Sequence, residues 1–247
     1  RTSYHQTVVL NGSNGAADRS YGIGPLLYFK PLLSLARMYF ARTPSVLKLL
    51  YPGRIWNMER KERAVYLTFD DGPIPHVTPW VLEQLATYNA KATFFCIGKN
   101  ASENHEILKK ITEGGHTIGN HTWSHLRGTN TPTASYIDDV QGAENALGLG
   151  VNGSERLLFR PPYGRITNDQ VHELKDRYRI VMWDVLSGDF DMRSTPEQCL
   201  KNVTRNIRSG SIVVFHDSVK AEERLRYTLP RTLEYLRNEG YAMKALR

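Results

Sequence analysis

The sequence has only two cysteines among its 247 residues, Cys96 and Cys199. Two cysteines cannot form a disulfide framework, and neither lies in a CxxC pair, which excludes the usual cysteine-based zinc and redox motifs. Cys96 lies in an apolar run and is expected in the core, whereas Cys199 is expected in a helix. Cysteine usage therefore leaves the compartment open between the cytoplasm and the cell envelope.

Long apolar runs are also absent. No stretch of about 20 unbroken apolar residues occurs, so no transmembrane helix is predicted. The nearest candidate, residues 23–40, is interrupted by Pro25, Lys30, Pro31 and Arg37. It also lacks the charged start and small-residue cleavage site of a signal peptide.

Positive charge is in excess but is not concentrated. The formal net charge is +7, and the densest basic region, 220–237, is broken by Glu222, Glu223 and Glu234. Such alternation is typical of a solvated helix face, so no nucleic-acid partner is expected. The basic surface suits weak association with a membrane or with anionic envelope polymers. The oligomeric state is not predicted.

The pattern along the chain divides it into two regions. Residues 1–20 are polar and rich in Gly, Ser and Asn, as in a flexible segment. Apolar positions in 26–51 fit one or two short helices, which either pack on the main domain or lie on a membrane surface. We therefore predict an N-terminal extension over 1–60 and a main domain over 61–247.

The main domain alternates short apolar runs with helical stretches. The expected strands are 65–69, 92–97, 117–119, 157–159, 180–183, 212–215 and 241–246. Runs rich in Val, Ile and Phe suit strands that are buried on both faces. Thr78-Pro79 and Thr195-Pro196 each place a capping hydroxyl before a proline at a helix start. Repeated βα units predict an α/β fold with a parallel sheet, open or closed into a barrel.

Polar residues follow five of the strand runs, always on the carboxyl side. They are Asp70 and Asp71, His121 and His125, Arg160, Asp184 and Asp189, and His216 with Asp217. The carboxyl ends of parallel barrel strands share one face, so these residues are expected to converge there. The agreement among five strands predicts a site at this face.

A metal site is the best explanation of part of this set. His121 and His125 are four residues apart, so on a helical turn both rings would point the same way. With one carboxylate of the Asp70-Asp71 pair they would form a His₂Asp set, which leaves positions open for water and substrate. The other carboxylate would take a proton. The alternative for the acidic pair is a turn or cap ahead of Gly72-Pro73.

The ordered motifs resemble the polysaccharide deacetylases of carbohydrate esterase family 4, over roughly residues 64–246. They are Thr68-Phe69-Asp70-Asp71-Gly72-Pro73, His121-Thr122-Trp123-Ser124-His125, Arg160-Pro161-Pro162-Tyr163-Gly164 and Val214-Phe215-His216. The resemblance implies a distorted, incompletely closed (β/α) barrel. It also implies a divalent metal, usually zinc, with cobalt or another ion as alternatives. The implied reaction is hydrolysis of N-acetyl groups on N-acetylglucosamine-containing glycans, with release of acetate.

The resemblance also implies a role for each matching residue. Asp71, His121 and His125 would hold the metal, Asp70 would be the general base, and Arg160 would orient Asp70. The backbone N–H of Tyr163 would bind the oxyanion. His216 would be the general acid, with Asp189 as its partner and Asp184 as the alternative. Trp123 is either a pocket wall or a core anchor.

Two positions depart from the family pattern. Phe190 follows Asp189 where the family usually has Trp, and Val214 stands where it usually has Leu. Both keep an apolar wall, so the departures concern the shape of the acetate pocket. Three other functions remain open: a non-catalytic glycan-binding relative, a basic binding protein, and a metal hydrolase of other small amides.

Overall fold

The computed structural model describes residues 39–150 and 156–247. The predicted flexible start, and the part of the predicted apolar helices before residue 39, lie outside these ranges. Within them, α1 (Ser45–Leu50) is a short helix that buries none of its residues. None of the helices in the two described ranges combines the length and hydropathy that a membrane span requires.

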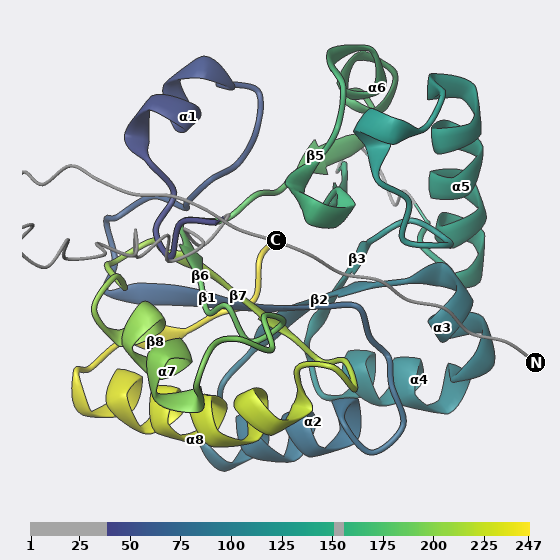
Figure 1. The fold of residues 1–247 in the computed structure, drawn as a ribbon. Helices are drawn as coiled ribbons and strands as arrows, with labels where there is room; N and C mark the ends of the chain where they lie inside the picture. The colour runs from purple at the N-terminus through teal and green to yellow at the C-terminus, as the bar shows by residue number, and fades with distance from the viewer. Residues whose placement is uncertain (1–38, 151–155) are drawn as a thin grey trace, which may run out of the picture. The chain divides into compact units, whose positions relative to one another are not determined.

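The fold is an α/β sheet of parallel strands curled into an open half-barrel, as predicted (Figure 1). The strands are β1 (Ala64–Asp70), β2 (Ala92–Cys96), β3 (Thr117–Asn120), β4 (Leu157–Phe159), β5 (Tyr178–Ile180), β6 (Val185–Leu186), β7 (Ile212–His216) and β8 (Ala242–Met243). Their order is β5-β4-β3-β2-β1-β7-β6, with β8 added beside the start of β1. The two strands at the ends of this order, β5 and β6, do not pair with each other, so the barrel stays open.

The helices follow the strands and cover the outside of the sheet. They are α2 (Thr78–Thr87), α3 (Gly98–Glu103), α4 (His105–Glu113), α5 (Thr133–Ala146), α6 (Asn168–Leu174), α7 (Pro196–Thr204) and α8 (Glu222–Asn238). Figure 1 shows α2, α4 and α8 along one face of β1, β2 and β7. Two 3-10 turns, Gly128–Asn130 and Pro162–Gly164, lie in the connections.

Alternation along β1 separates the outer core from the barrel interior. Leu67 and Phe69 are fully buried in the cluster that includes the apolar faces of α2 and α8. Their neighbours Thr68 and Asp70 therefore point to the opposite face, into the barrel. The interior carries both an apolar floor, which includes Phe95, and the polar side chains of the strand ends.

Three local predictions differ from the structure. The expected strand at 180–183 is split, because β5 ends at Ile180 and β6 begins only at Val185. The expected last strand shrinks to Ala242–Met243. Thr195 caps α7 as predicted, but Thr78 lies inside α2 and its hydroxyl bonds elsewhere. Both cysteines are buried, Cys96 in the core and Cys199 in α7, as expected.

Candidate active site

The site begins where β1 and β7 end side by side. The two strands pair in parallel with Asp70 opposite His216. Asp71 follows directly after β1 and adopts a left-handed backbone with φ 83°. The left-handed backbone ends the strand alternation at this residue, and the two acids contact different partners. Asp70 faces Arg160, and Asp71 faces the two histidines.

Arg160 crosses the barrel interior and fixes Asp70. Its side chain is fully buried and lies over the Phe95 ring at 4.1 Å. The guanidinium donates to Asp70 Oδ1 over 2.7 Å and to Thr68 Oγ1 over 2.7 Å. It also donates to two backbone carbonyls beyond β5. Because every bond of this buried cation points to a fixed acceptor, the Asp70 carboxylate is held in one orientation.

The two histidines are not presented by a helical turn, contrary to the sequence expectation. Residues 121–125 form a loop in which Thr122 and His125 have φ of 66° and 59°. The carboxylate of Asp139 on α5 holds this loop by accepting from the backbone N–H groups of Trp123 and Ser124. An aspartate remote in sequence thus supplies the bonds that a helix would have made internally.

His121 is bound as a neutral ring with its Nε2 free to bind a ligand. Its Nδ1 lies 2.7 Å from the carbonyl oxygen of Arg160. A carbonyl only accepts hydrogen bonds, so Nδ1 carries the proton and Nε2 keeps its lone pair. Burial lowers the pKa of His121 to about 4, which keeps the ring uncharged near pH 7. This Nε2 lies 3.8 Å from Asp71 Oδ1.

The donor set around Asp71 fits a divalent cation. Ligand atoms of Asp71, His121 and His125 all lie within 4.8 Å of one another, and His125 Nε2 is 3.2 Å from Asp71 Oδ1. That buried oxygen receives no hydrogen bond from the described part of the chain. A buried acceptor facing the His121 lone pair is unfavourable unless a cation lies between them. Burial acts to raise the pKa of Asp71, but His125 and the nearby positive His216 hold it below its usual range.

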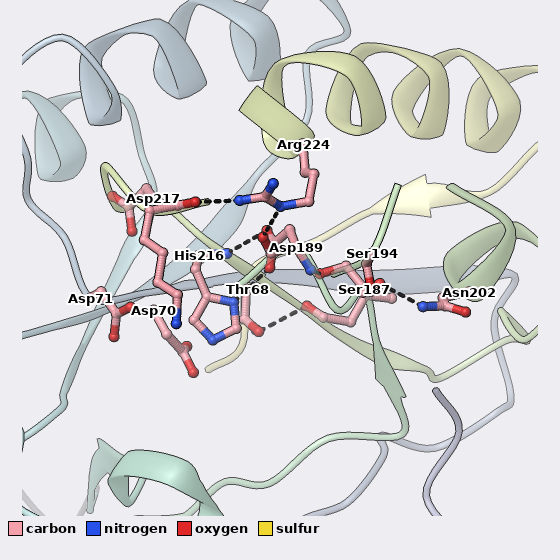
Figure 2. Close-up of polar contacts among 12 residues, drawn as sticks. Thr68, Asp70, Asp71, Ser187, Asp189, Ser194, Asn202, His216, Asp217 and Arg224 are labelled. Atoms are coloured by element: carbon pink, nitrogen blue, oxygen red, sulfur yellow. Dashed lines mark hydrogen bonds and ion pairs between the residues drawn. The ribbon is translucent and has the colours of Figure 1, made fainter. Parts of the chain in front are cut away.

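His216 and Asp189 form the second half of the site. Asp189 Oδ1 accepts from His216 Nδ1 over 2.8 Å, and its Oδ2 accepts from the His216 backbone N–H over 2.9 Å. Burial alone would lower the pKa of His216, but the charge and hydrogen bond of Asp189 raise it to about 9. In Figure 2 the imidazole lies between Asp189 on one side and Asp70 and Asp71 on the other. Asp184 instead pairs with Lys48 at 2.5 Å.

Tyr163 borders the histidines on the other side. It lies at the kink of the 3-10 turn Pro162–Gly164 with φ 59°. Its hydroxyl is 3.1 Å from His125 Nδ1, and its ring lies 4.7 Å from the His125 ring. The side chain of Tyr163 is 55% exposed, so it forms part of the solvent-facing rim of the site.

The two remaining predicted residues occupy different surroundings. Trp123 is half-buried, and a Cβ on Gly98 would lie 2.9 Å from its ring. This contact with α3 favours the core-anchor interpretation of Trp123. Val214 is buried on β7, two residues before His216, so both side chains point into the barrel. Val214 therefore shares the interior face of β7 with His216.

Asp217 is a buried acid that the sequence interpretation noticed but gave no role. It accepts from Gly72 N–H over 3.1 Å and from the Thr78 hydroxyl over 2.5 Å. Its own N–H donates to the backbone oxygen of Asp70. Burial raises the pKa of Asp217 to about 8. The only sequence signal was its position directly after His216, which does not reveal that it ties the two strand ends together.

Comparison with known proteins agrees with this geometry. The polysaccharide deacetylase profile matches residues 57–179, which include Asp70 and Arg160 but stop before His216. A peptidoglycan-N-acetylglucosamine deacetylase of Bacillus cereus is 34% identical over 188 residues, 75% of this chain and 87% of that protein. A chitooligosaccharide deacetylase of Azorhizobium caulinodans is 30% identical over 210 residues, 78% of this chain and 98% of that protein.

Solved structures give the same match. A peptidoglycan N-acetylglucosamine deacetylase in complex with 4-naphthalen-1-yl-N-oxidanyl-benzamide superposes with a TM-score of 0.74 at 29% identity, covering 83% of this chain and 95% of that one. A carbohydrate esterase family 4 pseudoenzyme from Bacillus anthracis superposes with a TM-score of 0.66 at 27% identity, covering 76% and 66%. The coverage and identity of the Bacillus cereus relative, together with the profile match, establish that this chain belongs to the polysaccharide deacetylase family.

Proposed function

We propose that this protein hydrolyses the N-acetyl groups of N-acetylglucosamine-containing glycans, releases acetate, and requires a divalent metal. One observation carries the proposal. Ligand atoms of Asp71, His121 and His125 converge within 4.8 Å. On the same rim stand an acid fixed by Arg160 and a histidine fixed by Asp189. A metal set flanked by a separate acid and a separate histidine can hydrolyse an unreactive amide.

Asp71, His121 and His125 would hold the metal. Two imidazoles and one carboxylate are ligands that suit zinc, with cobalt or another divalent ion as alternatives. When bound there, the cation supplies Lewis acidity toward an amide carbonyl and toward water. The carbonyl of Arg160 fixes the ring of His121, and the Tyr163 hydroxyl contacts the ring of His125.

Asp70 would accept the proton of the attacking water. Its Oδ1 is occupied by Arg160, whereas no hydrogen bond to Oδ2 is found among the described residues. The side chain is 5% exposed, so it is shielded from bulk water while still open toward the site. The ion pair with the buried guanidinium holds the carboxylate in place for this role.

His216 would deliver a proton to the departing sugar amine. With a pKa of about 9, the ring is protonated at neutral pH and can act as an acid. Asp189 holds Nδ1, so Nε2 is the atom left to face the substrate. The backbone N–H of Tyr163 would donate to the oxyanion, an interaction worth about 3 kcal/mol in other acyl-transfer sites.

Acetate release from defined substrates tests the proposal. Zinc-loaded protein would be given N-acetylglucosamine oligomers, peptidoglycan and simple acetamides, with Asp70→Asn as the inactive control. Release from either glycan and not from the simple acetamides supports glycan deacetylation. Release only from simple acetamides would favour the small-amide hydrolase, and release from none would refute the activity.

A non-catalytic glycan-binding role is the second candidate, because one structural neighbour is described as a pseudoenzyme. The complete pairs Asp70–Arg160 and His216–Asp189 argue against it here. Glycan binding without acetate release would favour this candidate.

A further inference from the structure

The segment before the barrel completes the sheet beside the candidate site. Ala41 and Thr43 exchange backbone hydrogen bonds with β6 and the residue before it: Leu186 N–H donates to Ala41, and Thr43 N–H donates to Asp184, each over 2.9 Å. The pairing is antiparallel, through a bridge between positions 42 and 185. It covers the edge of β6 that β7 leaves open.

Tyr39 reaches from this segment into the loop that carries Asp189. Its hydroxyl lies 3.0 Å from the hydroxyl of Ser194, which is 4% exposed. Its ring lies 5.1 Å from the Phe190 ring. A Cβ on Gly188 would come within 2.4 Å of the Tyr39 hydroxyl, and Gly188 has φ +79°. Tyr39 therefore occupies space that a side chain at position 188 would fill, so this packing depends on Gly188.

Phe190 lies in contact with both Tyr39 and His216. The two rings lie 5.0 Å apart and meet edge to face at 62°. Phe190 directly follows Asp189, whose carboxylate holds both the ring and the backbone of His216. The loop thus contacts the imidazole in two ways: Asp189 forms an ion pair with it, and the Phe190 ring packs against it. Tyr39 in turn packs on the Phe190 ring.

We propose that Tyr39 is a positioning residue for His216, acting through Phe190, and that the backbone pairing of Ala41 and Thr43 with the β6 region holds Tyr39 in place. This inference rests on the proposed function of His216 as the acid. Tyr39 keeps Phe190 against the imidazole, which fixes the ring plane and shields the His216–Asp189 hydrogen bond from water. Loss of the Tyr39 ring leaves space behind Phe190 and loosens the imidazole.

The kinetic test compares three variants of the full, zinc-loaded chain. Tyr39→Leu keeps apolar bulk but removes the ring, and we expect kcat to fall about 10- to 100-fold with little change in KM, since proton delivery follows binding. Tyr39→Phe keeps the ring and should restore most of the rate. Phe40→Ala is the matched control. Phe40 is next to Tyr39 in the chain and is 66% exposed, so its loss should leave kcat unchanged.

A second readout does not depend on activity. The His216 Nδ1 proton bound to Asp189 should give a sharp downfield NMR signal in the wild type and in Tyr39→Phe. Exchange with water should broaden that signal in Tyr39→Leu. If the wild type released no acetate, the proposed function would fail, while this signal would still decide the role of Tyr39.

Gly188→Ala reaches the same contact from the loop side, and it carries the test if Tyr39→Leu does not fold. Its added methyl group would displace the Tyr39 ring, so the same loss of kcat and the same broadening are expected. Wild-type kcat together with a sharp His216 signal, in whichever of the two variants folds, overturns the proposal.

Discussion

His216 and Asp189 are joined twice, through the imidazole Nδ1 at 2.8 Å and through the backbone N–H at 2.9 Å. The double contact fixes both the position and the charge of the ring. It also settles a choice that the sequence left open, since Asp184 lies beside Lys48 and the hydroxyl of Ser211 instead. The charge state of His216 leads to the first prediction.

The stabilising effect of His216 should disappear at high pH. The folded pKa of about 9 exceeds the ordinary histidine pKa of 6.5, so the charged ring stabilises the fold fully below pH 6.5 and loses this effect as the pH rises through 9. In metal-free protein, the stability gap between wild type and His216→Gln should shrink by up to about 3 kcal/mol between pH 6 and pH 10. Urea unfolding at several pH values measures it.

The control for that prediction is His172→Gln, whose side chain is 73% exposed. The difference in stability between His172→Gln and the wild type should stay near zero from pH 6 to pH 10. A His216→Gln gap that does not change with pH would mean that His216 is not held as a cation by Asp189.

Asp70→Asn should separate chemistry from metal binding. The amide keeps an oxygen for Arg160 but cannot accept the proton of water, so kcat should fall about 10²- to 10⁴-fold. Zinc affinity, measured by calorimetry, should stay close to that of the wild type because Asp70 is not in the donor set. Stability should also fall, by about 3 kcal/mol, since a buried cation loses its counter-charge.

Thr68→Val distinguishes these effects. It removes the neighbouring bond to the same guanidinium, which spans 2.7 Å, but leaves Asp70 intact. We expect lower stability with most of the activity retained. An equal loss of kcat in both variants would show that Asp70 acts only by supporting Arg160.

Tyr163→Phe should weaken the metal site without unfolding it. The change removes the hydroxyl that lies 3.1 Å from His125 Nδ1 and keeps the ring. Partners of metal-bound histidines typically contribute about 10-fold or more to affinity, so zinc should bind about 10-fold more weakly. Tyr227→Phe is the control. Arg231 lies 3.8 Å over the Tyr227 ring, as Arg127 lies 4.6 Å over the Tyr163 ring, but Tyr227 is on α8. Equal zinc affinities in the two variants would contradict this role.

Gly72→Ala should disturb Asp70 and Asp71 by displacing the neighbouring Asp217. A Cβ there would lie 2.0 Å from Asp217 Oδ2, in a site where Asp217 is fully buried. We expect a stability loss of about 1–3 kcal/mol in urea unfolding, together with weaker zinc binding. Gly53→Ala is the control, because nothing lies within 4 Å of its added carbon. Equal free energies of unfolding in the two variants would show that Asp217 moves aside without a cost in stability.

The convergence of the site could be predicted from sequence because parallel strands impose it. Asp70 and His216 lie 146 positions apart in the chain, yet they stand opposite each other in the register of β1 and β7. The family motifs added the separate expectations for Asp70 and Asp71. In the structure the two acids contact different partners, Asp70 the guanidinium of Arg160 and Asp71 the two histidines.

Features that depend on distant contacts could not be predicted. The histidine loop is shaped by Asp139, and Thr78 is drawn from a capping role by Asp217; neither partner is adjacent in sequence. Positive φ at Thr122 and His125 gives no compositional signal, because neither residue is glycine. The contact of Tyr39 with Phe190 joins positions 151 residues apart and follows no periodic pattern.

The central claim is that Asp71, His121 and His125 hold the metal on which deacetylation depends. Acetate release from N-acetylglucosamine oligomers, measured while zinc is added stepwise to chelator-treated protein, tests it most directly. The account predicts no release without metal, and a rise that saturates at one zinc per chain. Full release by demonstrably metal-free protein, or none at any zinc level, would contradict it.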